Sequence, residues 1–206
     1  MKQWKKMLLS LLLCLALTGC QTGPSAEDVA EALCKLYVHA DTKVSSVLKD
    51  WDTANVKDTI ENQLSEQLRS NLQAVGVQTV DSKALAAVTE SIMEAREKIP
   101  IDVEVIETVD EKVSLQITVG SLDISGIDRA AAEEAMSELS GLSELSEADL
   151  ERFVEAYTEA LQSGFDEADP SENQNTFTVD FVEKNGLWLP EDLNGFVELL
   201  GQYIRR

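Results

Sequence analysis

The chain has 206 residues, of which 44% are hydrophobic, and its formal net charge at pH 7 is −21. This hydrophobic content is enough for a folded core and excludes a disordered stalk. The negative charge opposes binding to nucleic acid and to anionic lipid. It suits cationic partners or loosely held divalent ions, but acidic residues on solvated helix faces without a specific partner are the simpler interpretation.

The first nineteen residues have the pattern of a secretory signal. Lys2, Lys5 and Lys6 are followed by an uninterrupted run of apolar or small residues at 7–17. Eleven residues are too few to cross a bilayer, for which about 20 are needed. The pattern predicts a signal peptide over residues 1–19. A retained membrane anchor and an ordinary secreted protein are the alternatives.

Residues 17–20 read Leu-Thr-Gly-Cys and resemble the bacterial lipobox, in which the cysteine is acylated and becomes the mature N-terminus. The resemblance implies a diacylglyceryl group on Cys20, with palmitate-type chains that hold the protein on the extracytoplasmic face of the cell membrane. Two acyl chains anchor a protein without a spanning helix. Residues 20–25 are then the lipidated cysteine and a tether, and residues 26–206 a single extracytoplasmic domain.

Three cysteines are present, and only one would remain free in the mature protein. Cys14 leaves with the signal peptide and Cys20 carries the lipid, so an internal disulfide is excluded. Cys34 lies beside Leu33 on a predicted helix, where a buried, small hydrophobic side chain is expected.

The first half of the domain has apolar residues at helical spacing. Ser25 and Asp28 form a capping signal for the first helix, Gly76 ends the third, and Pro100 stops the fourth. Helices are predicted at residues 26–40, 43–52, 55–75 and 82–99.

The period then changes to alternation, which predicts strands at residues 101–107 and 112–119 and a hairpin with one solvated face. An alanine-rich helix is predicted at 127–139, followed by a loop at 140–146. Ser146 and Asp149 then begin another helix, which is expected to end at Gly164.

The last part of the chain predicts a second hairpin and a final helix. Phe177, Val179 and Phe181 alternate after a polar loop at residues 166–176. Asn185-Gly186 is a strong signal for a two-residue hairpin turn, and Pro190 can open the last helix. The order predicts an α+β fold, with helices packed on a small antiparallel sheet built from two β-hairpins.

Residues 177–188 read Phe-Thr-Val-Asp-Phe-Val-Glu-Lys-Asn-Gly-Leu-Trp and precede an amphipathic segment. This ending resembles that of small exported lipoproteins of Gram-positive bacteria whose domain is similar to the nuclear transport factor two family. The similarity covers the lipobox and roughly residues 147–204. It implies a cone-shaped, nuclear transport factor two-like domain, and it supplies no functional residues.

No motif for catalysis, metal binding or a cofactor is visible. His39 is the one histidine, and its spacing from Cys34 separates the two by roughly 140° around a helix. The chain has no Gly-x-Ser-x-Gly, no Cys-x-x-Cys, no complete EF-hand loop and no glycine-rich phosphate loop. Glutamates four residues apart, such as Glu147, Glu151 and Glu155, predict solvated, mutually repelling helix faces.

Large aromatic side chains are the remaining candidates for a binding site. They could line a pocket between the helices and a curved sheet, although a simple core role is the alternative. The candidate pocket residues are Trp51, Phe153, Tyr157, Phe181 and Trp188.

These features predict a membrane-anchored surface lipoprotein that is not an enzyme and that binds a protein or small-molecule partner. One alternative is an enzyme with a sheet-lined pocket that uses carboxylates such as Asp180. Another is the solute-binding component of an importer, which the absence of two alternating α/β lobes disfavours.

Overall fold

The computed structural model describes residues 23–74, 76–77, 80–139 and 146–205. The predicted signal peptide at residues 1–19, the lipidation site Cys20 and most of the predicted loop at 140–146 lie outside these ranges. No helix of the described residues is both long enough and apolar enough to cross a membrane.

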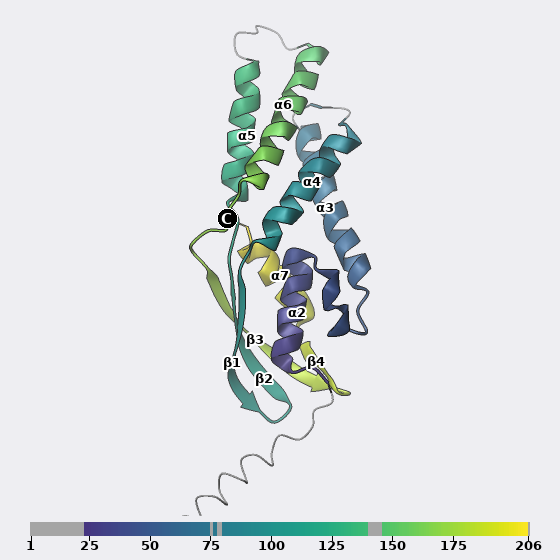
Figure 1. The fold of residues 1–206 in the computed structure, drawn as a ribbon, viewed down its shortest axis with the longest axis vertical. Helices are drawn as coiled ribbons and strands as arrows, with labels where there is room; N and C mark the ends of the chain where they lie inside the picture. The colour runs from purple at the N-terminus through teal and green to yellow at the C-terminus, as the bar shows by residue number, and fades with distance from the viewer. Residues whose placement is uncertain (1–22, 75, 78–79, 140–145, 206) are drawn as a thin grey trace, which may run out of the picture.

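The described chain has the predicted α+β fold (Figure 1). Two β-hairpins and their surrounding helices follow one another in the predicted order. The elements are α2 (Ala26–His39), the 3-10 helix η1 (Thr42–Ser46), α3 (Thr53–Ala74), α4 (Ser82–Glu97), β1 (Ile101–Val109), β2 (Lys112–Val119), α5 (Ile124–Glu138), α6 (Glu147–Asp166), β3 (Asn175–Lys184), β4 (Leu187–Pro190) and α7 (Leu193–Tyr203).

The two hairpins join into one four-stranded sheet with the order β1-β2-β3-β4, in which every neighbouring pair is antiparallel. Helices α2 and α7 cover one face of the sheet, where α2 contacts β1 and β4 and α7 contacts β4 (Figure 1). Side chains of β2 and β3 alternate between this face and the solvated face. Leu115, Ile117 and Phe181 on the covered face are completely buried, and the ring of Phe181 meets Phe196 of α7 with 6.2 Å between centroids. The other face carries polar residues.

Local signals in the sequence act as predicted at the helix starts and at the second turn. Ser25 and Ser146 each cap a helix in a capping box, with Asp28 and Asp149 as the returning carboxylates. Asn185 and Gly186 both have positive φ, 56° and 79°, as a type I′ turn requires.

Four boundaries differ from the prediction. The helix expected at 43–52 is only the five-residue η1, because Val44 and Leu48 reach the core through a tight turn with i→i−3 hydrogen bonds. Pro190 ends β4 opposite Phe181 instead of opening a helix, and α7 begins after the N-cap Asp192.

The third difference concerns Gly164, which lies inside α6 and does not end it. A Cβ at this position would lie 2.7 Å from Cγ2 of Ile127 on α5. The glycine therefore allows two helices to approach closely. The helix expected at 127–139 also begins earlier, at Ile124, because the Asp123 carboxylate accepts the Gly126 N–H at 2.9 Å.

Strand β1 is more exposed than the predicted hairpin with one solvated face. Its pairing with β2 shifts between Val105 and Glu107, as in a β-bulge. Ile101 and Val103 are half-buried, but 48% of Val105 and 53% of Ile106 are exposed. The far half of this edge strand thus leaves apolar side chains in solvent.

Buried polar contacts join α4 to the end of α2. The guanidinium of Arg96 donates to the carbonyl oxygens of Val38 and Tyr37 at 2.8 and 2.7 Å, and burial lowers its pKa to about 10. The His39 ring contacts the Ile99 carbonyl oxygen through Nε2 at 2.8 Å. Arg96 satisfies carbonyls that the end of a helix leaves without partners.

Candidate functional site: the α5–α6 groove

The five aromatic residues expected to line a pocket occupy three separate places. Trp51 and Trp188 share the wall of a small cavity of about 30 Å³ near the start of α2. Phe153 and Tyr157 stack on each other along α6, with 5.8 Å between ring centroids. Phe181 is fully buried under the sheet. The five side chains therefore do not line one common pocket, and the interior around Phe181 is filled.

The burial of Cys34 in the core explains its role. No part of Cys34 is exposed, and burial raises the pKa of its thiol to about 12. A thiol that stays protonated is a poor nucleophile. Cys34 is thus the small, buried side chain that its neighbours on the helix predicted.

Asp180 lies on the solvated face of the sheet. Its carboxylate accepts a hydrogen bond from the Ser114 hydroxyl at 2.6 Å and pairs with the Lys112 ammonium at 2.8 Å. The bond from Lys112 is the main cause that lowers the pKa of Asp180. Lys112 also reaches Glu191 at 3.1 Å. This arrangement ties β2 to β3 across their outer face and keeps the carboxylate charged.

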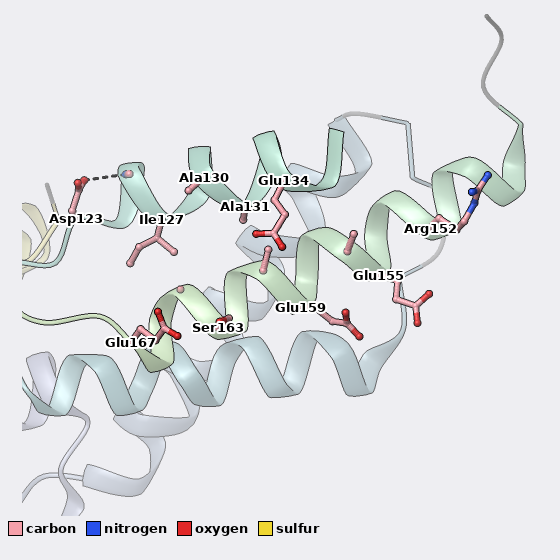
Figure 2. A pocket seen from close by; sticks show the side chains of 14 residues that line it. Asp123, Ile127, Ala130, Ala131, Glu134, Arg152, Glu155, Glu159, Ser163 and Glu167 are labelled. Atoms are coloured by element: carbon pink, nitrogen blue, oxygen red, sulfur yellow. Dashed lines mark hydrogen bonds between the residues drawn. The ribbon is translucent and has the colours of Figure 1, made fainter. Parts of the chain in front are cut away.

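A wide, open groove of about 980 Å³ runs between α5 and α6 (Figure 2). Its floor consists of small side chains together with Ile127, and its walls carry carboxylates from both helices. The small floor residues are Gly126, Ala130, Ala131, Ala156, Ala160, Ser163 and Gly164. The acidic wall residues are Asp123, Glu134, Glu155, Glu159 and Glu167. Arg152 is the one cationic residue in the lining.

The sequence produces this groove because alanine and glycine hold the two helices together at close range. Ala131 and Ala135 of α5 are buried, and Ile127 packs where Gly164 has no side chain. Tyr157 of α6 donates a hydrogen bond to the Asp128 carboxylate of α5, and burial is the first cause that raises the pKa of Tyr157. Because the floor side chains are short, the longer glutamate side chains form the walls of the groove.

The acidic wall on α6 belongs to a longer stripe of glutamates spaced four residues apart. Glu147, Glu151, Glu155 and Glu159 are all exposed. A second hollow of about 680 Å³, on the side of α4, shares Glu155 and Glu159 with the groove. The stripe is therefore a ridge between two hollows.

The carboxylates of the groove have no cation of their own. Arg152 is engaged by Asp149, its neighbour on α6. Among the residues that the structure describes, none of the five acidic wall residues takes part in an ion pair within 4.0 Å. Like charges at i,i+4 destabilise a helix slightly. The walls can thus accept cationic groups from another molecule.

Within the described ranges, no group of three or more His, Cys, Asp or Glu side chains is placed to hold a metal ion. The sequence indicated the glutamate pairs of α6 but not their partner surface. The signal that could have found it is the alanine-rich segment at 127–139, which suits a close helix pair.

Comparison with known proteins places this fold beside one solved structure. The crystal structure of a "putative lipoprotein (ycdA)" from Bacillus subtilis subsp. subtilis str. 168 superposes with a TM-score of 0.60 at 18% sequence identity. The match covers 87% of this chain and 56% of that chain, so this chain spans little more than half of its neighbour's length. At this identity the similarity concerns the fold.

No curated protein has a matching sequence. The family described as "Domain of unknown function (DUF5105)" matches residues 28–201. This range includes every element from α2 to the body of α7, with both hairpins and the groove helices. The chain belongs to the DUF5105 family.

Proposed function

We propose that this protein is a lipoprotein anchored through Cys20 on the extracytoplasmic face of the cell membrane, and that it binds a basic segment of a partner protein in the α5–α6 groove. The leader sequence and the lipobox resemblance support the anchor. The Bacillus subtilis neighbour, which carries the word lipoprotein in its own description, adds support. The nuclear transport factor two-like resemblance and the Gram-positive origin stay predictions.

The single observation that carries the binding role is the groove with its five carboxylates on a floor of small side chains. A floor of alanine and glycine lets a backbone approach closely. A segment with lysine or arginine on one side and small residues on the other complements both features. Charge complementarity of this kind speeds encounter and selects the partner.

The α5–α6 groove suits binding better than catalysis. Its carboxylates are on open, solvated walls, and an acid–base pair needs an environment that separates two pKa values. Asp180, the carboxylate named for the enzyme alternative, is half-buried on the solvated face of the sheet and paired with Lys112. We therefore propose a non-catalytic role, and neither the enzyme nor the importer alternative gains a specific supporting observation.

The groove is tested with two variants of equal charge change. Glu155→Lys with Glu159→Lys reverses the α6 wall, whereas Glu27→Lys with Glu104→Lys alters exposed acids outside the groove. A lysine- and alanine-rich helical peptide is titrated against each by calorimetry at low and high salt. We expect the wall variant to lose binding at least tenfold and the control to retain it. Equal affinities in all three proteins would overturn the groove assignment.

The anchor is tested separately. The Cys20→Ser variant should leave the membrane fraction for the soluble fraction. Mass spectrometry of the mature N-terminus should find a diacylglyceryl group on Cys20 in the parent protein. A Cys20→Ser protein that stays fully in the membrane fraction contradicts the anchor and leaves the groove test unaffected.

A further inference from the structure

Exposed apolar side chains gather on the edge strands of the sheet. Five large hydrophobic residues of the described chain are notably exposed, and four of them belong to the edge strands β1 and β4. They are Val105 at 48%, Ile106 at 53%, Val109 at 54% and Leu187 at 44%. The fifth, Met136, lies on α5.

The strand register places Val109 and Leu187 at the same end of the sheet. Val109 pairs with Lys112, which pairs with Val182, which in turn pairs with Leu189. Leu187 lies two residues nearer the second turn, opposite Lys184. Figure 1 shows both hairpin turns at the lower end of the molecule, beside the start of α2.

The tether leaves the fold at this end as well. A Cβ on Gly23 would lie 3.6 Å from the carbonyl oxygen of Gly186 in the β3–β4 turn. Pro24 lines the small cavity together with Leu187 and Trp188. The first described residues are therefore packed against β4.

Only two residues lie between Cys20 and Gly23, and this stretch of chain spans at most about 11 Å when fully extended. An acylated Cys20 would hold Gly23, and with it the adjacent β3–β4 turn, close to the bilayer surface, and the β1–β2 turn lies at the same end of the molecule. We infer that the side chains of Val109 and Leu187 insert into the lipid surface, so that the hairpin end of the protein faces the bilayer. This inference rests on the lipidation of Cys20 proposed above.

The charges of the molecule suit this orientation. Asp110, Glu111 and Glu183 lie at the two turns with Lys112 and Lys184, so the tip carries a smaller negative charge than the groove, where five carboxylates face one arginine. The acidic walls of the α5–α6 groove lie at the opposite end of the long axis in Figure 1. With the hairpin end on the bilayer, the acidic groove therefore lies away from the lipid and faces the surroundings.

The test uses the full, lipidated chain on phosphatidylcholine vesicles. A nitrobenzoxadiazole label is placed on Val109→Cys and, as the matched control, on Met136→Cys. Cys34 does not compete for the label because it is fully buried. On vesicles we expect the label at position 109 to shift its emission to the blue and to escape quenching by iodide. The label at position 136 should remain open to iodide, and Leu187→Asp should partly restore quenching at position 109.

The outcomes separate this inference from the anchor itself. If the protein floats with the vesicles but iodide quenches both labels equally, the anchor stands and the seating is wrong. If the labelled protein does not float at all, the lipidation of Cys20 fails and the seating fails with it. A blue shift at position 109 that appears in Cys20→Ser protein without vesicles and grows with protein concentration would mean that a second copy covers the patch, which also overturns the inference.

Discussion

The body of the molecule, formed by α2, the sheet and α7, differs sharply from the arm, formed by α5 and α6. The body buries large side chains completely, among them Leu33, Leu36 and Phe181. In α5 the buried residues are the alanines Ala131 and Ala135, and Ile127 is only half-buried. In the arm the large buried side chains, among them Leu161 and Phe165, belong to α6, so α5 is the less deeply packed of its two helices.

The two regions also differ in how charged side chains are arranged on their helices. In α2 of the body, Glu31 pairs with Lys35 at 2.6 Å. In α6 of the arm, glutamates follow one another at four-residue spacing. A helix face of mutually repelling glutamates does not favour stability. The proposed binding of a basic segment would account for the repelling glutamates of the arm.

The largest expected effect comes from truncating the body core. Phe181→Ala should cost about 3–5 kcal/mol of unfolding free energy, because it leaves a cavity in a filled interior. Ile127→Ala in the arm should cost less than half as much, since its side chain is only partly buried. Urea denaturation checks both values. Equal losses would mean that the arm is packed as tightly as the body.

A glycine substitution should have opposite signs in the two regions. Gly164→Ala places a Cβ 2.7 Å from Ile127 and should destabilise by about 1–3 kcal/mol. Gly201→Ala in α7 meets nothing within 4 Å and should stabilise by about 0.4–1 kcal/mol. Thermal unfolding measures both. Adding Ile127→Ala should relieve much of the Gly164→Ala penalty, and a strictly additive double variant would refute the close helix crossing.

The body and the arm each contain a capping box made of the same residue types, serine and aspartate, so the two can be compared directly. Ser25→Ala and Ser146→Ala should each cost about 1 kcal/mol. Hydrogen bonds from these serines lower the pKa of Asp28 and of Asp149. A carboxyl whose pKa is lower in the folded protein stabilises the fold fully at pH values above its pKa in the unfolded chain, which is about 3.9. This stabilisation is lost as the pH falls through the pKa of the folded protein.

We therefore expect the unfolding free energy of the parent protein to fall as the pH drops below about 4. Asp28→Asn should flatten this dependence, as urea titrations at several pH values can show. An unchanged pH slope in the Asn variant would exclude the Asp28 carboxylate as a source of the dependence.

The smallest effect concerns the charge stripe. Glu155→Gln should raise stability by about 0.2–0.5 kcal/mol by relieving repulsion at i,i+4, and should weaken peptide binding. Glu31→Gln should lower stability slightly because it removes the pair with Lys35. Both effects should shrink as salt is added. A destabilised Glu155→Gln protein would show that this glutamate has a structural partner.

Much of the fold could be predicted from local patterns. The strand at Lys112–Val119, both capping boxes and the Asn185-Gly186 turn are where the sequence placed them. These features depend on residues within a few positions of one another. The helix boundary at Gly164 could not be predicted, because its reason lies on another helix, at Ile127.

The candidate site was predictable only in part. Acidic spacing on α6 was visible, but the pairing of that face with the alanines of α5 was not. The aromatic residues drew attention because of their type, yet the fold distributes them over three places. Residue type alone does not say which side chains share a surface.

The amino-acid sequence by itself determined the α+β class, the helix caps, the alternation of the strands and the charge of the chain, because each follows from near neighbours or from composition. Tertiary structure alone decided that α5 and α6 form a groove and that the exposed ends of β1 and β4 lie beside the tether. Surfaces assembled from distant segments exist only after the chain has folded, since burial elsewhere decides which faces remain open.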